Sequence, residues 1–182
     1  MESLEERLEA LPAAPRDRGR VALVVRKVEG GVRELPERVR LDPEQGIPGD
    51  AWGRRRQPHP EAQLAVMHLG IAELLANGQP VTLSGDNLYL DLDLSAANLP
   101  PGTRLRAGGC ILEVTPKPHN GCSKFRARFG PDSVLFASRA DLRHRNLRGI
   151  YMRVVEAGDI GPGDTVEVLS RPGVGSRAGG SA

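Results

Sequence analysis

Apolar and polar residues alternate in several short runs along the chain, a period of two that is typical of half-buried β-strands. The strongest run is Arg20–Val28, and the pair Gly30-Gly31 then predicts a hairpin into a second strand. Other short runs predict strands at Val32 onward, Val39–Leu41, Gln63–Met67, Val81–Leu83, Thr103–Ala107, Cys110–Val114, Gly149–Glu156 and Thr165–Leu169. About eight to ten short strands separated by turn residues indicate an all-β fold, either a barrel or a sandwich, with few helices.

Helical spacing appears in only three places. Leucines at positions 4, 8 and 11 predict a short helix over residues 2–11, and Gly70–Ala76 predicts another that ends at Asn77-Gly78. The third begins near Cys122, as described below. We therefore expect an N-terminal helix and linker at 1–19, a β-rich domain at 20–170 and a disordered Gly/Ser/Ala-rich tail at 171–182.

Composition restricts the class of protein. With 182 residues, 39% apolar and 26% charged, the chain resembles a globular protein that has a full hydrophobic core. Aromatic residues make up only 3%, which argues against a nucleic-acid stacking surface. No apolar run is long enough to span a membrane, and Met1–Glu9 is too acidic for a signal peptide. Two cysteines do not form a disulfide framework, so we expect a cytoplasmic protein with free thiols.

The segment around Cys122 carries the strongest chemical signal. The strand that starts at Cys110 must end at the prolines that follow it, and Asn120-Gly121 is a turn pair. Phe125 and Phe129 are four residues apart and precede a glycine, which predicts a short helix that opens at Cys122. Free N–H groups at a helix start, together with positive charge from His119, Lys124 and Arg126, favour the thiolate form of a cysteine. The alternative is a buried, inert thiol.

Positive charge is concentrated around this segment. Between positions 117 and 153 only Asp132 and Asp141 oppose a large basic surplus. The basic residues are Lys117, Lys124, Arg126, Arg128, Arg139, Arg143, Arg145, Arg148 and Arg153. Such a surplus is either a solvated face or a site for a phosphate or carboxylate.

Elsewhere Asp50, Asp86 and Asn87 lie in glycine-containing loops, where they either cap turns or belong to a site. His119 and Cys122 have zinc-ligand spacing, but a second such pair is lacking.

Several of these stretches, in their order along the chain, resemble the MOSC domain family, named after the C-terminal domain of molybdenum cofactor sulfurases. The chain is most similar to the small stand-alone bacterial members, and the resemblance covers roughly residues 20–170. It rests on Gly46-Ile47-Pro48-Gly49-Asp50-Ala51-Trp52, Ser84-Gly85-Asp86-Asn87-Leu88, Pro100 to Val114, the segment from Val114 to Gly130, and Leu147-Arg148-Gly149-Ile150-Tyr151.

The resemblance implies a β-barrel, closed or partly open, with one functional cysteine. In the family this cysteine carries sulfur as a persulfide or meets the molybdenum of a molybdopterin cofactor, and its counterpart here is Cys122. Asp50 and Asn87 match the Gly-Asp and Asn-Leu landmarks, and an arginine fork suits the phosphate of a pterin cofactor. The candidate cofactor-binding residues are Asp50, Asn87, Lys117, His119, Asn120, Lys124, Arg126, Arg128 and Arg148.

Two departures from the family pattern limit what can be carried over. The second landmark more often reads Phe-Gly-Glu-Asn-Leu, whereas here it is Ser84-Gly85-Asp86-Asn87-Leu88. A chain of 182 residues also leaves no room for the pyridoxal-phosphate desulfurase domain of the large sulfurases. Pyridoxal phosphate would therefore contribute only through a separate cysteine desulfurase partner.

The leading hypothesis is a molybdenum-cofactor protein that performs sulfur transfer or a molybdenum-dependent reduction. Its partners would be the pterin-molybdenum cofactor and either a cysteine desulfurase or a molybdoenzyme acceptor, with no role for nucleic acid or a membrane. Two alternatives remain open at this point. One is a non-catalytic carrier of the cofactor or of sulfur, and the other is a cysteine-dependent hydrolase unrelated to molybdenum.

Overall fold

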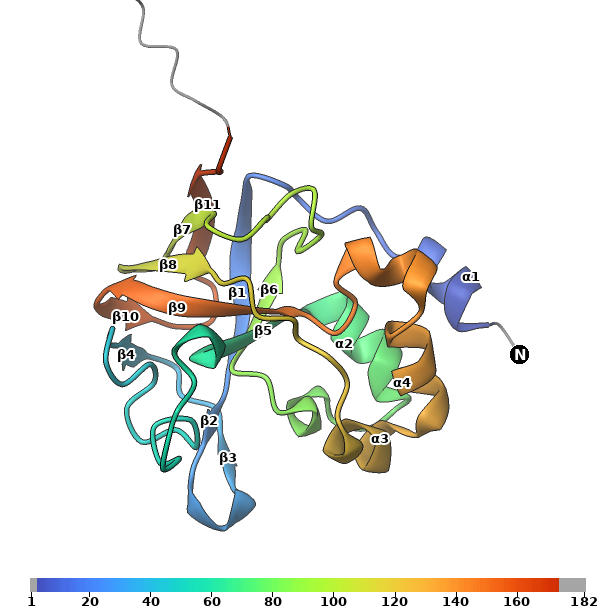
Figure 1. The fold of residues 1–182 in the computed structure, drawn as a ribbon, viewed down its shortest axis with the longest axis horizontal. Helices are drawn as coiled ribbons and strands as arrows, with labels where there is room; N and C mark the ends of the chain where they lie inside the picture. Colours follow the sequence, from blue (N-terminus) through green and yellow to red (C-terminus); the bar gives the residue numbers. More distant parts are fainter. Residues whose placement is uncertain (1–2, 174–182) are drawn as a thin grey trace, which may run out of the picture.

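Seven strands close into a β-barrel in the computed structural model, which describes residues 3–173 (Figure 1). Around the barrel their order is β1-β11-β7-β8-β9-β5-β6. The strands are β1 (Arg18–Val24), β5 (Leu64–His68), β6 (Leu88–Asp91), β7 (Arg104–Ala107), β8 (Cys110–Val114), β9 (Ile150–Glu156) and β11 (Thr165–Ser170). The prediction of a β-rich barrel is confirmed, and of the two forms expected the closed one is observed.

One pair of neighbours in the barrel is parallel. Strands β5 and β6 run in the same direction, with Val66 opposite Leu88, whereas the other barrel pairs are antiparallel. A parallel pair needs a crossover, and here α2 (Leu69–Ala76) and the 3₁₀ turn η3 (Val81–Ser84) provide it. The predicted strand at Val81–Leu83 is therefore wrong, because these residues form the last turn of that crossover. The crossover delivers the Ser84–Asn87 turn to the start of β6.

Two small sheets extend from the barrel. One is the hairpin of β2 (Arg26–Lys27) and β3 (Arg33–Glu34), which contains η1 (Glu29–Gly31) and projects away from the barrel in Figure 1. Gly30 and Gly31 adopt φ of 72° and 76°, which confirms the predicted glycine turn. The other sheet pairs β4 (Val39–Leu41) with β10 (Gly158–Ile160).

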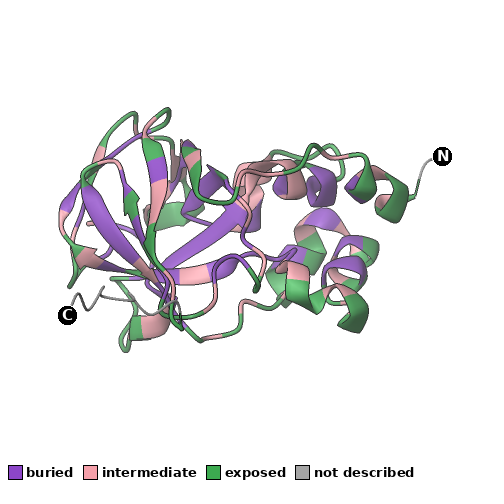
Figure 2. Cartoon of the chain, turned by 90° about the horizontal axis from the view of Figure 1, so that it is seen from above, coloured by how far each residue is buried: buried purple, intermediate pink, exposed green. Residues whose placement is uncertain are grey.

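One hydrophobic cluster is formed largely by residues of the barrel strands. The helices gather on one side of the barrel and bury a second hydrophobic cluster there (Figures 1 and 2). They are α1 (Leu4–Glu9), α2, α3 (Ser123–Phe129) and α4 (Pro131–Ala137), with the 3₁₀ turn η4 (Ala140–Arg145). The 3₁₀ turn η2 (Pro60–Ala62) lies apart from them, against β9. Phe125 and Phe129 of α3 pack in this cluster, with ring centroids 4.8 Å apart. Their burial fixes α3, and with it Cys122, against the barrel. None of the helices in residues 3–173 is long and apolar enough to cross a bilayer.

The end of the described chain requires one correction. Arg171 was expected to begin a disordered tail, but its side chain donates hydrogen bonds to the carbonyl of Asn98 at 2.8 Å and to Asp17 at 2.7 Å. Arg171 is therefore attached to the folded part of the protein. The rest of the predicted tail, from position 174 on, lies outside the described residues.

Candidate functional site

A cleft of about 390 Å³ opens beside the barrel and contains Cys122. Its walls come from the β2–β3 hairpin, the loop around Trp52, the Ser84–Asn87 turn, the start of α3 and the start of β9. Six of the ten predicted site residues line it, namely Asn87, His119, Cys122, Lys124, Arg128 and Arg148. The other four, Asp50, Lys117, Asn120 and Arg126, do not line this cleft.

Cys122 is the N-cap residue of α3, as the sequence predicted. Its backbone is extended, with φ −117° and ψ 170°, and its carbonyl accepts a hydrogen bond from the N–H of Arg126 at 3.0 Å. The thiol is exposed and makes no capping hydrogen bond, so it is free to react. Cys110, in contrast, is fully buried in the barrel, where desolvation raises its pKa to about 12.

These two environments predict a large difference in thiol reactivity. Brief treatment with iodoacetamide at pH 7 should label Cys122 at least about a hundredfold faster than Cys110, because the thiolate is the reactive form and Cys110 holds its proton. Peptide mass spectrometry after a time course measures both rates in one sample. Equal labelling of the two thiols would contradict the assignment of Cys122 as the reactive residue.

Asp50 and Asn87 hold the floor of the cleft together. The Asp50 carboxylate accepts hydrogen bonds from the backbone N–H of Lys27 at 2.7 Å, from Trp52 N–H at 3.0 Å and from the Asn87 amide at 3.1 Å. Asn87 also accepts from the N–H of Ala65 at 3.1 Å. Both side chains thus join the loop before Trp52 to β2, β5 and β6, and their first role is to position these segments.

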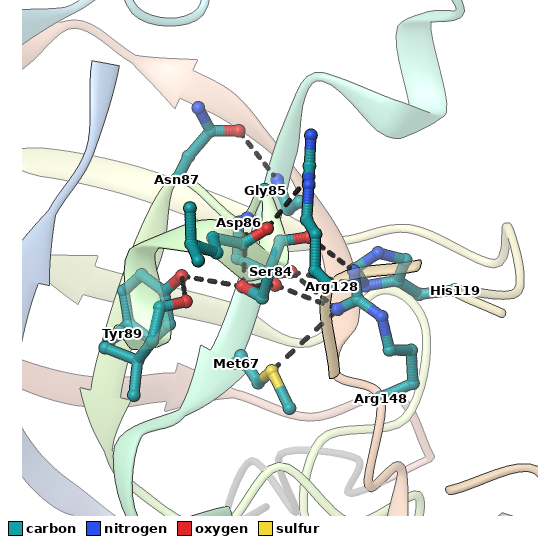
Figure 3. A network of polar contacts seen from close by, with 12 residues as sticks. Met67, Ser84, Gly85, Asp86, Asn87, Tyr89, His119, Arg128 and Arg148 are labelled. Atoms are coloured by element: carbon teal, nitrogen blue, oxygen red, sulfur yellow. Dashed lines mark hydrogen bonds and ion pairs between the residues drawn. The ribbon is translucent and has the colours of Figure 1, made fainter. Parts of the chain in front are cut away.

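Beneath the cleft lies a buried ion pair between Asp86 and Arg148 (Figure 3). Nη1 of Arg148 donates to both carboxylate oxygens, at 2.8 and 3.0 Å, and Nη2 donates to the carbonyl of Ser84 at 3.2 Å. The guanidinium also stacks 4.4 Å from the ring centroid of Phe125. Burial is the largest single influence and opposes the ionisation of Asp86, but the Arg148 charge and the hydrogen bonds from Ser84 and Arg148 together outweigh it, so the pKa of Asp86 is lowered.

The sequence placed Arg148 among the candidate cofactor-binding residues, but in the fold its guanidinium is engaged by Asp86. Its side chain is only 7% exposed, and its charge is already matched by the Asp86 carboxylate, whose side chain is fully buried. Arg148 connects the Ser84–Asn87 turn to α3 through Asp86 and Phe125. It therefore supports the segment that carries Cys122.

His119 forms the wall between Asp86 and Tyr151. Its Nδ1 lies 3.7 Å from Oδ1 of Asp86, and its ring centroid lies 4.2 Å from that of Tyr151. Burial lowers the pKa of His119 to about 3. The imidazole is therefore neutral at pH 7, and the expectation that it adds positive charge beside Cys122 was wrong. His119 therefore contributes a neutral, buried aromatic ring to the cleft lining, packed against Tyr151.

The positive charge of the cleft comes largely from the N-terminal part of the chain. Lys27, Arg33, Arg54 and Arg55 line it together with Lys124 and Arg128, and Glu29 is the one carboxylate in the lining. Within residues 3–173, none of these six cationic side chains forms an ion pair with a carboxylate. Several instead donate to backbone carbonyls, such as Lys27 to Gly85 at 2.7 Å. The cleft thus holds an uncompensated basic wall, defined by these six side chains.

Three buried nitrogen atoms in the cleft lining have no hydrogen-bond partner in the described part of the chain. They are Nε of Arg33, Nδ1 of His119 and Nε of Arg148. A buried polar atom without a partner is costly, so such atoms mark places where water or a ligand completes the site.

Sequence reasoning missed the N-terminal half of the basic wall. The run Arg54-Arg55-Arg56 was visible, but it lies more than sixty positions before Cys122. The loop and the hairpin reach the cysteine only through barrel closure and the Asp50–Asn87 hydrogen bonds.

Comparison with known proteins matches residues 60–167 to the model of the MOSC domain, a range that includes Asn87, Cys122 and Arg148. A search of curated proteins finds no match. Among solved structures, a crystal structure of a hypothetical protein has a TM-score of 0.63 at 20% identity, covering 86% of this chain and 70% of the other.

Two further crystal structures share the fold. YuaD from Bacillus subtilis has a TM-score of 0.59 at 17% identity, covering 87% of this chain and 100% of the other. YiiM from Escherichia coli has a TM-score of 0.55 at 21% identity, covering 84% and 70%. The sequence match extends over more than half of the chain, and it includes five of the seven barrel strands in full, β5 to β9, together with the cysteine segment just described. The chain belongs to the MOSC domain family.

Proposed function

We propose that this protein binds a molybdenum cofactor in the cleft, with the thiol of Cys122 directed to its reactive end. The observation that carries the proposal is an exposed cysteine in a cleft whose basic wall forms no ion pair with a carboxylate within residues 3–173. A phosphorylated ligand would neutralise that wall, and the arginine fork matches phosphate geometry. Membership of the MOSC family supports the same cofactor.

The residues of the cleft fit such a group. When bound, the cofactor supplies a redox-active metal, and a thiolate is the soft ligand that such a metal prefers. The unpartnered Nε atom of Arg33 is a buried N–H donor, which a polar ring or phosphate can satisfy. The rings of His119 and Tyr151, tilted by 34° to each other, line the same cleft as Cys122.

Two chemical roles for Cys122 follow from the proposal. In sulfur transfer, the thiol carries sulfane sulfur as a persulfide that a separate cysteine desulfurase delivers and a molybdoenzyme accepts. In a molybdenum-dependent reduction, Cys122 would hold the metal through its thiolate, and the cofactor would supply the redox chemistry. Transfer of sulfur from the persulfide to a molybdoenzyme that lacks it would support the first role, and turnover of N-hydroxylated bases would support the second. If the protein does neither but binds the cofactor, it acts as a carrier.

The hydrolase alternative has less support from the geometry. A thiol hydrolase needs a base within hydrogen-bond reach of its nucleophile. In the described part of the chain no hydrogen bond joins His119 to Cys122, and the Nδ1 side of that ring faces the buried Asp86.

Single alanine substitutions in the basic wall test the proposal, because the variant proteins should still fold. Arg55 and Lys124 are exposed, and within residues 3–173 neither side chain has a hydrogen bond or ion pair, so each can be replaced by alanine without disturbing the core. Each replacement should weaken binding of the cofactor by about 1.5–3 kcal/mol, roughly ten- to a hundredfold, through loss of a charge-assisted contact. Quenching of pterin fluorescence during titration measures the affinity.

A matched control is Arg106→Ala, which removes an exposed arginine on β7 that lines none of the clefts described here. Its affinity for the cofactor should equal that of the unmodified protein. If Arg55→Ala and Lys124→Ala also leave the affinity unchanged, the basic wall does not hold the cofactor.

A further inference from the structure

A second cleft of about 450 Å³ borders the first. It is lined by Pro118–Gly121, by the end of α4 and by the loop that leads into β9. His119 and Arg148 line both clefts, so these two side chains form a shared wall. The segment that leads to Cys122 therefore has a cleft at each side, and the proposed function uses only one of them.

Most of the positive charge in the second cleft is already compensated. Arg148 is paired with Asp86 at 2.8 Å, as described above. Arg139 donates to Glu5 at 3.0 Å and to Asp141 at 3.1 Å. Neither arginine therefore leaves a net charge for a ligand to neutralise.

Arg143 is the exception. Its side chain lines the second cleft, and within residues 3–173 it has no hydrogen bond and no ion pair. No carboxylate side chain lines this cleft, so the site carries one uncompensated positive charge. The C-terminal end of α4, at Ala137 and Ser138, lines it as well.

Neutral polar groups complete the lining. Asn120, Ser138 and Asn146 contribute amide and hydroxyl groups. The shared wall adds one unpartnered buried nitrogen atom, Nε of Arg148, on a side chain that is 7% exposed. An arginine Nε always carries a hydrogen, so this atom is a donor without an acceptor.

We propose that the second cleft binds a small polar molecule that carries a single carboxylate. One free guanidinium beside neutral hydrogen-bonding groups matches one negative charge, whereas the first cleft, with six cationic side chains against the single carboxylate of Glu29 in its lining, matches a phosphate. The cleft adjoins the segment that leads to Cys122, and the wall of His119 and Arg148 separates it from the cleft that contains the thiol. The binding of the carboxylate therefore does not rest on the proposed function.

Titration of the isotope-labelled protein with sodium acetate, and separately with inorganic phosphate, tests the proposal. With ionic strength held constant by chloride, acetate should shift the backbone amide signals of Asn120, Gly121 and Asn146 and reach saturation. Arg143→Ala should weaken acetate binding roughly tenfold, since it removes the charge-assisted contact. Arg145→Ala, a nearby arginine outside both clefts, should leave it unchanged.

Inorganic phosphate should instead shift the backbone amide signals around Gly85. Arg55→Ala should weaken phosphate binding, and Arg143→Ala should leave phosphate binding unchanged. Acetate shifts confined to the first cleft, or equal acetate affinity in Arg143→Ala and the unmodified protein, would overturn the second site. If the cofactor does not bind but acetate still binds at Arg143, the proposed function fails and the carboxylate site stands.

Discussion

Replacing Arg148 with alanine is expected to lower the free energy of unfolding by about 3–5 kcal/mol, the usual cost of leaving a buried charge without its partner. The carboxylate of Asp86 is fully buried, and Arg148 supplies both of its short ionic contacts. The substitution also removes the guanidinium from the ring of Phe125. Urea denaturation followed by circular dichroism measures the change.

Arg126→Ala is the matched control, because Arg126 is exposed and has no side-chain partner in the described part of the chain. Its free energy of unfolding should change by less than about 0.5 kcal/mol. The double variant Asp86→Leu/Arg148→Met should recover much of the stability, since it removes both charges and keeps the volume. If Arg148→Ala is as stable as Arg126→Ala, the buried pair does not support the site.

The second large effect concerns Cys122 itself. Cys122→Ser should abolish sulfur transfer or molybdenum-dependent turnover, because a hydroxyl neither carries sulfane sulfur nor serves as a soft ligand. Cofactor affinity should fall by less than in the basic-wall variants, since the wall remains intact. The exposed position at a helix N-cap, where serine is a favoured residue, means that folding should be unaffected.

Assays of sulfur transfer and of turnover, run beside the cofactor titration, separate these two effects. Cys110→Ser serves as the comparison for the thiol. It alters a buried residue of the barrel, so it should change stability and leave the chemistry in place. Activity retained in Cys122→Ser would exclude this cysteine as the reactive group.

Local patterns predicted the strands and the position of Cys122 well. The Asn120-Gly121 turn and the Phe125/Phe129 spacing were sufficient to predict a helix that opens at the cysteine, because both signals act within one helical turn. The strand β6 was missed and Val81–Leu83 was misassigned, since short apolar runs look alike whether extended or part of a crossover.

Electrostatic roles were predicted less well, because they depend on contacts between distant parts of the chain. Arg148 looked like a free phosphate ligand, yet its partner Asp86 lies 62 positions earlier. His119 looked like a cation, and burial makes it neutral. Composition and spacing identify charged residues, but only the fold decides which charges remain uncompensated.

The measurement that tests the account most directly is the molybdenum and pterin content of the protein after purification from a host that makes the cofactor. The unmodified protein should retain both in roughly equal molar amounts, and Arg55→Glu/Lys124→Glu should retain little of either because the basic wall is reversed. A molybdoenzyme purified from the same cells shows that the cofactor was available. If that enzyme is loaded while the unmodified protein carries neither molybdenum nor pterin, the cleft beside Cys122 is not a molybdenum cofactor site.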